Sequence, residues 1–391
     1  GKRPQMVRQL TLPFENRGEA PKGGRSEEEP PAVQSDERSG ASDLMGRVVS
    51  RPNLQAALKR VRKNKGSPGI DGMTVEELSG HLRENWPQLR EQLLAGRYRP
   101  AMVKQQLIPK SSGGMRKLGI PTVLDRFIQQ ALLQVLQPMF DPTFSQHSHG
   151  FRPGRRAHDA VIEAQRYIQQ GRKVVVDVDL EQFFDRVNHD VLMGRLAKRI
   201  GDVRVLGLIR GYLEAGILAN GCATERYEGT PQGGPLSPLL ANVLLDAVDK
   251  ELEKRGHSFV RYADDCNVYV RSRRAGERVM RLLTRLYSKL RLRVNASKSA
   301  VDLATRRKLL GYSFWVAPGR VIKRRVSAKA LGALKDRVRA VTRRTGGRSI
   351  EQVVNELRMY LTGWKQYYRL AETPRIFAQL DEWLRHRLRA I

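Results

Sequence analysis

The chain has 391 residues and a formal net charge of +31, from 71 Lys and Arg against 40 Asp and Glu. This excess implies a polyanionic partner, for which nucleic acid is the usual candidate. The sequence argues against a membrane protein, because it has no run of about 18 apolar residues. It also argues against a disulfide or zinc framework, because it has only two cysteines. We therefore expect a protein of the reducing cytoplasm with no membrane partner.

The N-terminal residues 1–45 are rich in Gly, Pro, Ser, Glu and Arg and poor in aromatics, which predicts a disordered tail. The folded part begins with a helix predicted over residues 50–63, where apolar side chains recur at helical spacing. A basic, glycine-rich loop follows and contains Lys63 and Lys65. We interpret these two lysines as nucleic-acid-binding residues, with a plain connecting loop as the alternative.

A two-stranded hairpin with a glycine turn is predicted over residues 103–121. Lys110 and Arg116 flank that turn, where the two cations could converge on a triphosphate. Two solvated surface cations are the alternative. A second basic stretch, residues 150–158, contains Arg152 between glycines and further arginines.

Two acidic segments follow. Residues 174–180 read as a buried strand in which Asp177 and Asp179 share one face, with the intervening valines on the other. Such a strand end can deliver the Asp179 carboxylate and the Leu180 backbone carbonyl to a metal ion. The second segment, residues 259–270, predicts a β-hairpin with two adjacent acids at its turn.

The acids of that turn are Asp264 and Asp265, which repel each other unless a divalent cation neutralises them. An acidic turn without chemistry is the alternative. With Asp179 they would form a carboxylate trio able to hold two Mg²⁺ ions. Such a metal pair activates a 3′-hydroxyl and stabilises leaving pyrophosphate in nucleotidyl transfer.

The C-terminal part changes character. An amphipathic helix is predicted over residues 275–290, and residues 290–299 alternate like a strand that leads into a turn. From residue 319 to residue 349 there are eleven Lys or Arg and one acid. A helical apolar face between residues 331 and 341 is accompanied by three cations. Such a charge run is often only a solvated face, but here it follows a candidate nucleotidyl-transfer site.

Three blocks occur in a fixed order: residues 179–185 with their two phenylalanines, residues 230–242 with Gln232-Gly233 and Ser237-Pro238, and Tyr262-Ala263-Asp264-Asp265. Together they resemble the catalytic blocks of reverse transcriptases. The second is similar to the Gln-Gly-x-x-x-Ser-Pro block of the enzymes encoded by group II introns, and residues 360–369 look like the maturase (X) domain of those proteins. The resemblance covers roughly residues 50–391.

This resemblance implies an α+β fold: a right-hand polymerase with fingers and an antiparallel-sheet palm over residues 46–318, followed by an α-helical thumb over residues 319–391. It makes Asp179, Asp264 and Asp265 the catalytic residues, and these three with the Leu180 carbonyl the ligands of two Mg²⁺ ions.

The resemblance also implies further roles. Phe184 would exclude a ribose 2′-hydroxyl by steric clash, and Lys298 would protonate the leaving pyrophosphate. The dNTP-binding residues would be Lys110, Arg116, Phe184, Gln232 and Lys298. The nucleic-acid-binding residues would be Lys63, Lys65, Arg152, Lys323, Arg324, Arg325, Lys335, Arg339 and Arg343.

The implied activity is RNA-directed DNA synthesis, with a maturase role in intron splicing and retrohoming in the bacterial cytoplasm. The implied partners are group II intron RNA, an RNA template/DNA primer duplex, a DNA target and dNTPs. No endonuclease with Cys pairs and His is visible, so we expect an endonuclease-less, group IIC-like member or a shortened chain.

Two alternatives remain open. One is a domesticated or defence-associated reverse transcriptase on the same scaffold. The other is an RNA-binding splicing cofactor with a decayed site, against which the three intact aspartates argue. An RNA-templated RNA polymerase is disfavoured by Tyr262-Ala263 before the acids and by the bulk of Phe184.

Overall fold

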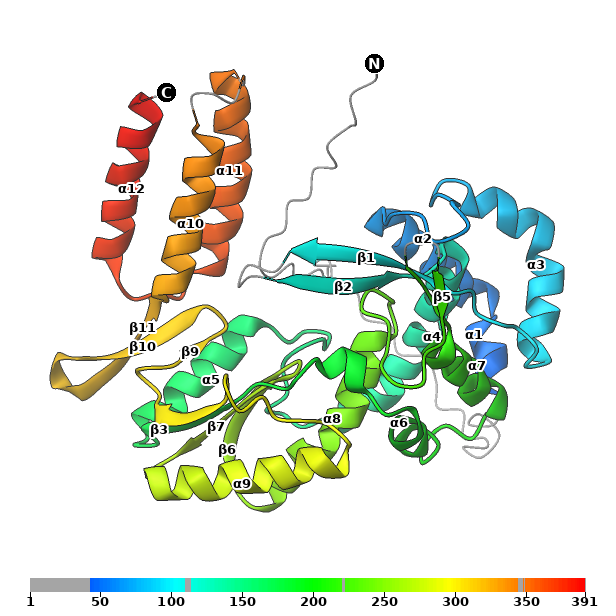
Figure 1. Ribbon diagram of the computed structural model, residues 1–391, viewed down its shortest axis with the longest axis horizontal. Coiled ribbons are helices and arrows are strands. Elements are labelled where there is room, and N and C mark those ends of the chain that lie inside the picture. Colours follow the sequence, from blue (N-terminus) through cyan, green and yellow to red (C-terminus); the bar gives the residue numbers. More distant parts are fainter. Residues whose placement is uncertain (1–42, 110–113, 220–221, 344–346, 348, 391) are drawn as a thin grey trace, which may run out of the picture.

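The computed structural model describes residues 43–390 apart from residues 110–113, 220–221, 344–346 and 348. Most of the predicted disordered tail, residues 1–45, therefore lies outside the described residues, and so does Lys110. Figure 1 shows fingers made of helices and one sheet, a palm made of a second sheet with helices on it, and a thumb of three long helices. This architecture confirms the predicted α+β fold class.

The fingers are built around a helix that is buried on most sides. α4 (Val123–Phe140) begins after Thr122, whose side chain accepts a hydrogen bond from the Asp125 backbone N–H, as an N-cap does. α2 (Arg51–Asn64) packs against it and confirms the helix predicted over residues 50–63. The other helices around this part are α1 (Leu44–Val48), α3 (Leu78–Leu94), α6 (His189–Leu196) and α7 (Val203–Glu214).

The fingers sheet contains the hairpin predicted over residues 103–121. Its strands are β1 (Val103–Pro109) and β2 (Met115–Ile120), which pair antiparallel. β1 also pairs in parallel with β4 (Ile217–Ala219), and β4 pairs antiparallel with β5 (Cys222–Thr224). Within the two strands only Val103 and Gly119 are buried, and Pro109 and Met115, the strand ends nearest the turn, are exposed.

The palm sheet is antiparallel and has the order β6-β7-β3-β8. Its strands are β6 (Ser258–Tyr262), β7 (Asp265–Val270), β3 (Val174–Val178) and β8 (Ala300–Leu303). Residues 290–299, predicted as a strand leading into a turn, do end in a turn, at residues 296–298. The strand part is reduced to one isolated bridge between Val294 and Leu180, because the chain first makes a left-handed turn at Arg291, with φ of 58°.

Helices cover both faces of the palm sheet. α8 (Ser237–Lys254) and α9 (Arg273–Lys289) pack on the face that carries Val176 and Val178. α5 (Ala157–Gln169) packs on the other face, which carries Val175 and Val260. The alternation predicted for β3 is therefore confirmed, and the even-numbered valines belong to the main hydrophobic core.

A second hairpin connects the palm with the thumb. β9 (Lys308–Leu309), β10 (Tyr312–Ala317) and β11 (Val321–Val326) form a three-stranded sheet. The helices α10 (Ala328–Val341), α11 (Ile350–Tyr367) and α12 (Pro374–Arg389) follow. The first residues of the segment predicted as helical thumb, 319–326, are thus a turn and a strand. Among the helices of the described residues, none combines the length and apolar character that a membrane crossing needs.

Candidate active site

Two neighbouring strands of the palm carry the predicted aspartates. Asp179 directly follows β3, and Asp264 and Asp265 lie where β6 turns into β7, the strand paired with β3. Tyr262 pairs with Asp265 across the turn, so Asp265 opens β7. Asp179 and Asp264 are half-buried, and Asp265 is exposed.

The turn between β6 and β7, residues 262–265, is called the acidic turn below. Ala263 adopts a left-handed conformation with φ of 56°, which is uncommon for a residue with a Cβ. Gly150 packs directly against it, since a Cβ at Gly150 would lie 2.1 Å from the Ala263 nitrogen. Only glycine at residue 150 therefore permits this approach.

The carboxylates of the site influence one another. Burial raises the pKa of Asp264, and the charge of Asp179 adds to this rise, whereas Arg116 acts against it. Part of the Asp265 side chain reaches solvent. Burial by the surrounding protein is the main cause that raises the pKa of Asp265 to about 7, and the charges of the neighbouring acids add to the rise. The predicted crowding of negative charge is therefore present.

Asp177 shares the face of Asp179 but has a different partner. The Arg307 guanidinium lies 2.7 Å from its carboxylate and also donates to the Lys298 carbonyl oxygen. Burial raises the pKa of Asp177, and the hydrogen bond from Arg307 opposes this rise. Asp177 is thus held by an ion pair beside the site.

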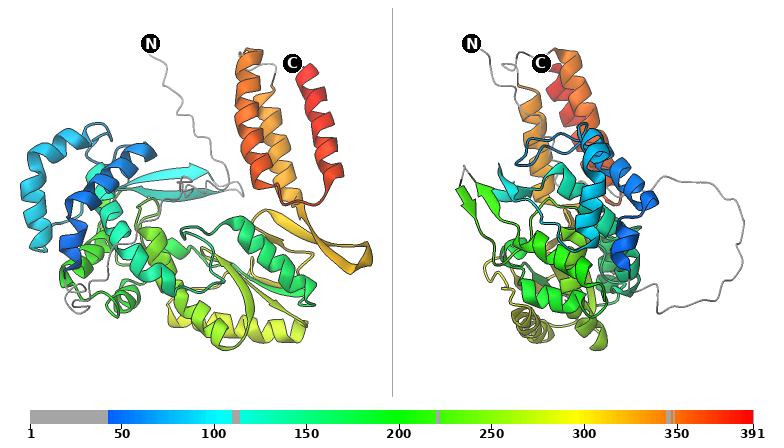
Figure 2. Two further views of the ribbon diagram at one scale, coloured as in Figure 1. Left: turned by 180° about the vertical axis from the view of Figure 1, so that it is seen from behind. Right: turned by 90° about the vertical axis from the view of Figure 1, so that its right-hand side faces the viewer.

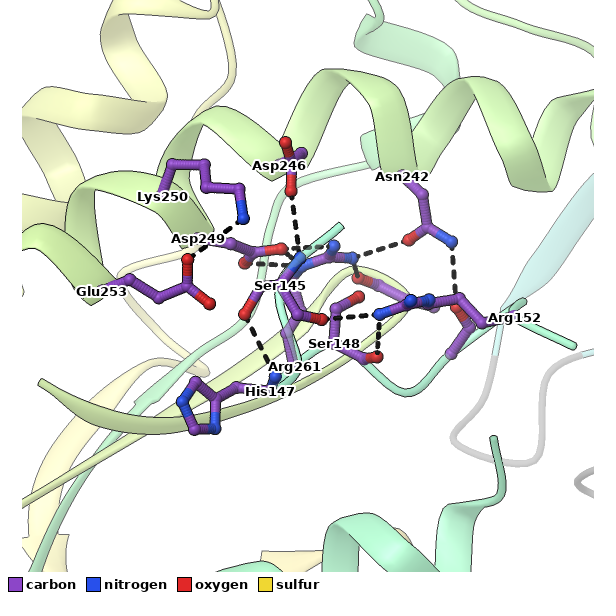
Figure 3. A network of polar contacts seen from close by, with 12 residues as sticks. Ser145, His147, Ser148, Arg152, Asn242, Asp246, Asp249, Lys250, Glu253 and Arg261 are labelled. Carbon is purple, nitrogen blue, oxygen red and sulfur yellow. Dashed lines mark hydrogen bonds and ion pairs between the residues drawn. The ribbon is translucent and has the colours of Figure 1, made fainter. Parts of the chain in front are cut away.

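A buried polar network between α8 and the end of β6 holds the acidic turn in place (Figure 3). Arg261 is fully buried and donates three hydrogen bonds to the carboxylate of Asp249, at 2.6–2.9 Å. It also donates to the Ala263 carbonyl oxygen and to the Asn242 side chain, both at 2.9 Å. One guanidinium therefore connects α8 with the residue that precedes Asp264.

Sequence reasoning missed this role of Arg261, although the strand pattern contained a signal for it. Side chains of a strand alternate between faces, and Arg261 occupies the same face as the buried Phe259. An arginine at a core-facing position needs a buried acidic partner. Asp249, twelve residues upstream, is that partner.

Arg152, predicted to bind nucleic acid, belongs to the same buried region. It is 8% exposed and donates to the carbonyl oxygens of Ser145 and Ser148 and to the carboxylate of Asp141. Its donors are directed into the protein, so its surroundings contradict a phosphate contact. The family resemblance had implied a role for Arg152 that these internal bonds do not support.

The block at residues 230–238 connects the fingers with the palm. The Gly119 N–H of β2 donates to the Gln232 carbonyl oxygen at 2.9 Å. Gly233, with φ of 130°, lies so close that a Cβ there would come 2.7 Å from the Gly119 oxygen. Ser237 donates to the Pro231 carbonyl oxygen at the start of α8. Gln232 is thereby fixed, half-buried, between the two parts.

Three further residues predicted to contact a nucleotide surround the carboxylates. Arg116 is exposed on β2, and its charge acts on Asp264. The Lys298 ammonium lies 3.9 Å from the Asp179 carboxylate. Phe184 is half-buried, with its ring edge-on to the buried Phe183 at 5.1 Å between centroids.

The other predicted nucleic-acid-binding cations have three kinds of surroundings. Arg324 is ion-paired with Glu372 at 3.0 Å, and its side chain is 16% exposed, so part of its charge is already balanced inside the protein. Lys335 and Arg339 on α10 each lie 5.8 Å from the ring of Trp383 on α12. The remaining cations reach solvent at least in part: Lys63, Lys65, Lys323, Arg325 and Arg343.

The donor chemistry of the site fits Mg²⁺, which prefers oxygen ligands. Three carboxylates and the Leu180 carbonyl supply only oxygen, and Leu180 is held by its bridge to Val294. Within the described residues, no three His, Cys, Asp or Glu side chains already have the spacing of a metal-binding cluster.

Comparison with known proteins defines the class of this chain. Residues 108–314, more than half of the chain, match the family model of reverse transcriptases (RNA-dependent DNA polymerases). The chain therefore belongs to the reverse transcriptase family. Residues 331–391 match the model of the group II intron maturase-specific domain. This combination confirms the resemblance to group II intron-encoded reverse transcriptases.

Two curated relatives are similar to about half of the chain. It is 35% identical to Protein YkfC of Escherichia coli (strain K12) over 216 residues, 54% of this chain and 57% of that protein. It is 37% identical to Group II intron-encoded protein LtrA of Lactococcus lactis subsp. cremoris over 206 residues, 52% of this chain and 34% of LtrA. The matched part thus spans less than two thirds of either relative.

Among solved structures, a chain of a "Partial Cas6-RT-Cas1--Cas2 complex" is 28% identical, with a TM-score of 0.40. The similarity covers 63% of this chain and 42% of that chain. A TM-score this low supports no argument about function.

Proposed function

We propose that this protein is an RNA-directed DNA polymerase that adds dNTPs to the 3′-hydroxyl of a primer paired with an RNA template. The observation that carries this proposal is the meeting of Asp179 with Asp264 and Asp265 beside an exposed fingers cation, Arg116, whose charge reaches the carboxylates. Two Mg²⁺ ions, when bound by these oxygens, would supply activation of the hydroxyl and charge stabilisation of the triphosphate.

The chain's own residues supply positioning. The Arg261 network fixes the acidic turn, and the bond between Gly119 and Gln232 fixes the fingers hairpin relative to the palm. Arg116 would bind the triphosphate, and Phe184 would exclude a ribose 2′-hydroxyl by its bulk. Lys298, beside Asp179, would donate a proton from its ammonium to the leaving pyrophosphate.

We further propose a maturase role, in which the protein binds group II intron RNA during splicing and a DNA target during retrohoming, in the bacterial cytoplasm. The match of residues 331–391 to the maturase-specific domain supports this role. The basic thumb and the net charge of +31 support an RNA partner.

Primer extension on an RNA template with dNTPs and Mg²⁺ tests the polymerase. We expect wild-type protein to extend the primer. The extension rate of Asp264→Ala should be lower by at least about 10³-fold, because this variant lacks a carboxylate that would hold the metal ions in position. Asp302→Ala, which removes an acid from β8 of the same sheet, is the matched control and should retain activity.

Failure of wild-type protein to extend, with RNA binding intact, would favour the RNA-binding splicing cofactor. Extension without any stimulation of intron splicing would favour the domesticated or defence-associated reverse transcriptase.

A further inference from the structure

Helix α9 presents a stripe of arginines on the outside of the palm. Arg274, Arg278, Arg281 and Arg285 are spaced by three or four residues, so these side chains follow one face of the helix, and Arg271 precedes its first turn. All five are exposed. The opposite face is apolar and buried in the main core, through Val279, Leu283 and Tyr287.

A groove of about 1000 Å³ runs between α9 and the adjacent ends of β6 and β7. Its apolar floor includes Val279 and Leu282, and no acidic residue of the described chain lines it. The lining contains six arginines: Arg172, Arg255, Arg271, Arg278, Arg281 and Arg285.

Most of this positive charge has no internal counter-charge. Arg255 is paired with Glu251, and Arg172 donates to the Gln170 side chain. In the described part of the chain, the other four arginines of the groove form no ion pair. Burial, followed by the charge of Arg255, lowers the pKa of His257 in the same groove. The local potential is therefore positive, and an anionic partner would relieve the repulsion.

The groove lies along α9 and at the ends of the palm strands that point away from the candidate active site, because Val270 in its lining pairs with Val174 at the start of β3, whereas Asp179 follows the end of β3. A Cβ at Gly276 of α9 would meet the side chains of Val174 and Val176 at 3.5 Å. Asp177 and Asp179 lie on the other face of β3. Figures 1 and 2 agree that α9 lies at the end of the molecule away from the thumb helices. A duplex held between thumb and acidic turn would not reach this groove.

We propose that this groove binds the phosphate backbone of RNA at a second site, separate from the template–primer site. The exposed stripe from Arg274 to Arg285 is about 16 Å long at 1.5 Å per residue. At about 3.4 Å of axis per nucleotide in one strand, it spans four or five phosphates. Insertion into a lipid surface is disfavoured, because the apolar face of α9 is already buried in the protein.

The test uses full-length protein whose template–primer site is saturated with a chain-terminated DNA primer on an RNA template. A fluorescein-labelled RNA duplex of 20 base pairs, about two helical turns, is then titrated by anisotropy. The variant is Arg278→Gln/Arg281→Gln/Arg285→Gln. The matched control, Lys59→Gln/Arg83→Gln/Arg90→Gln, removes the same charge from exposed positions on α2 and α3.

We expect the variant to bind the second duplex at least tenfold more weakly than wild type, with the slope of log K against log salt smaller by about 2.7 for three lost phosphate contacts. Primer extension by the variant should equal that of wild type, and so should second-duplex binding by the matched control. Arg278→Lys/Arg281→Lys/Arg285→Lys, which keeps the charge, should retain most of the binding. This rescue separates loss of charge from loss of folding.

Four results would overturn the proposal. The first two are no second-duplex binding by wild type and equal binding by wild type and the triple Gln variant. The third is a variant that loses primer extension together with RNA binding. The fourth is a variant that loses binding to poly-glutamate or to phosphatidylserine vesicles while its RNA binding is unchanged. The inference does not rest on polymerase activity. Failure of extension by wild type would defeat the proposed function and leave this RNA titration valid.

Discussion

Replacement of Arg261 by methionine should destabilise the protein by about 3–5 kcal/mol, since breaking a buried ion pair by removing one partner has a cost of this size. The structure supports the upper part of that range. Asp249 is fully buried and receives three of the five hydrogen bonds made by Arg261. Asn242 and the Ala263 carbonyl would lose a donor as well.

A double-mutant cycle makes this reasoning specific. Because the main cost is an uncompensated carboxylate, Arg261→Met/Asp249→Leu should be at least about 2 kcal/mol less destabilised than the sum of the two single variants. Urea unfolding followed by circular dichroism measures each free energy, and a constant denaturant slope shows that the comparison is sound. Arg278→Met removes an exposed arginine from the same palm and should change stability by less than about 0.5 kcal/mol.

The same variant reports on activity. With Arg261 gone, the carbonyl beside Asp264 has no donor, so Arg261→Met should lose primer extension even below its unfolding temperature. A loss of less than about 1 kcal/mol in stability, or strict additivity in the cycle, would refute the view that this network holds the acidic turn.

Three further predictions concern sugar selection, salt and pH. Phe184→Ala should increase rNTP incorporation in primer extension, and unchanged sugar selectivity would remove its assignment as a steric gate. RNA affinity should fall roughly 10³- to 10⁵-fold between about 50 and 200 mM salt if six to ten phosphates are neutralised, and a nearly flat response in anisotropy titrations would contradict a backbone contact of that size. Burial opposes ionisation of Glu163, but hydrogen bonds from His147 and His149 outweigh it and hold its pKa well below the usual 4.5. A depressed pKa stabilises the fold above the unfolded value and loses that contribution as pH falls below it. Wild type should therefore exceed Glu163→Gln in stability by more at pH 6 than at about pH 3, where part of the advantage is lost because the carboxyl group protonates in the unfolded chain; an unchanged difference in urea unfolding at the two pH values would exclude this source of stability.

The parts of the fold that the sequence predicted depend on local patterns. Alternation of side chains placed β3 and its two aspartates, and two short strand-like runs placed the hairpin that carries Asp264 and Asp265. The helix that became α2 followed from spacing alone. Within such segments, neighbouring residues determine the outcome, so no knowledge of distant partners was needed.

Sequence reasoning was insufficient where a distant partner decides the role of a charge. Arg324 was assigned to nucleic acid because it lies in a basic run, but Glu372, 48 residues later, pairs with it. Arg152 was assigned from the family resemblance, and its donors are used inside the protein. Asp177 shares a face with Asp179, yet Arg307, 130 residues away, neutralises it. A count of charges along the sequence cannot distinguish a charged side chain that is paired inside the protein from one that is solvated.

The base of the thumb is joined to helix α5 of the palm by several bonds. The Gln165 side chain donates to the Ile322 carbonyl oxygen at 2.7 Å, and His158 contacts the Tyr367 carbonyl oxygen at 2.6 Å. The Ile322 N–H donates in turn to the Gln169 side chain. The bonds of Ile322 hold β11 against α5, and the His158 contact holds Tyr367, the last residue of α11, against the same helix. A movement of α11 away from the palm would have to break the contact with His158. Under the proposed function, a duplex would therefore bind against a thumb whose base is fixed to the palm.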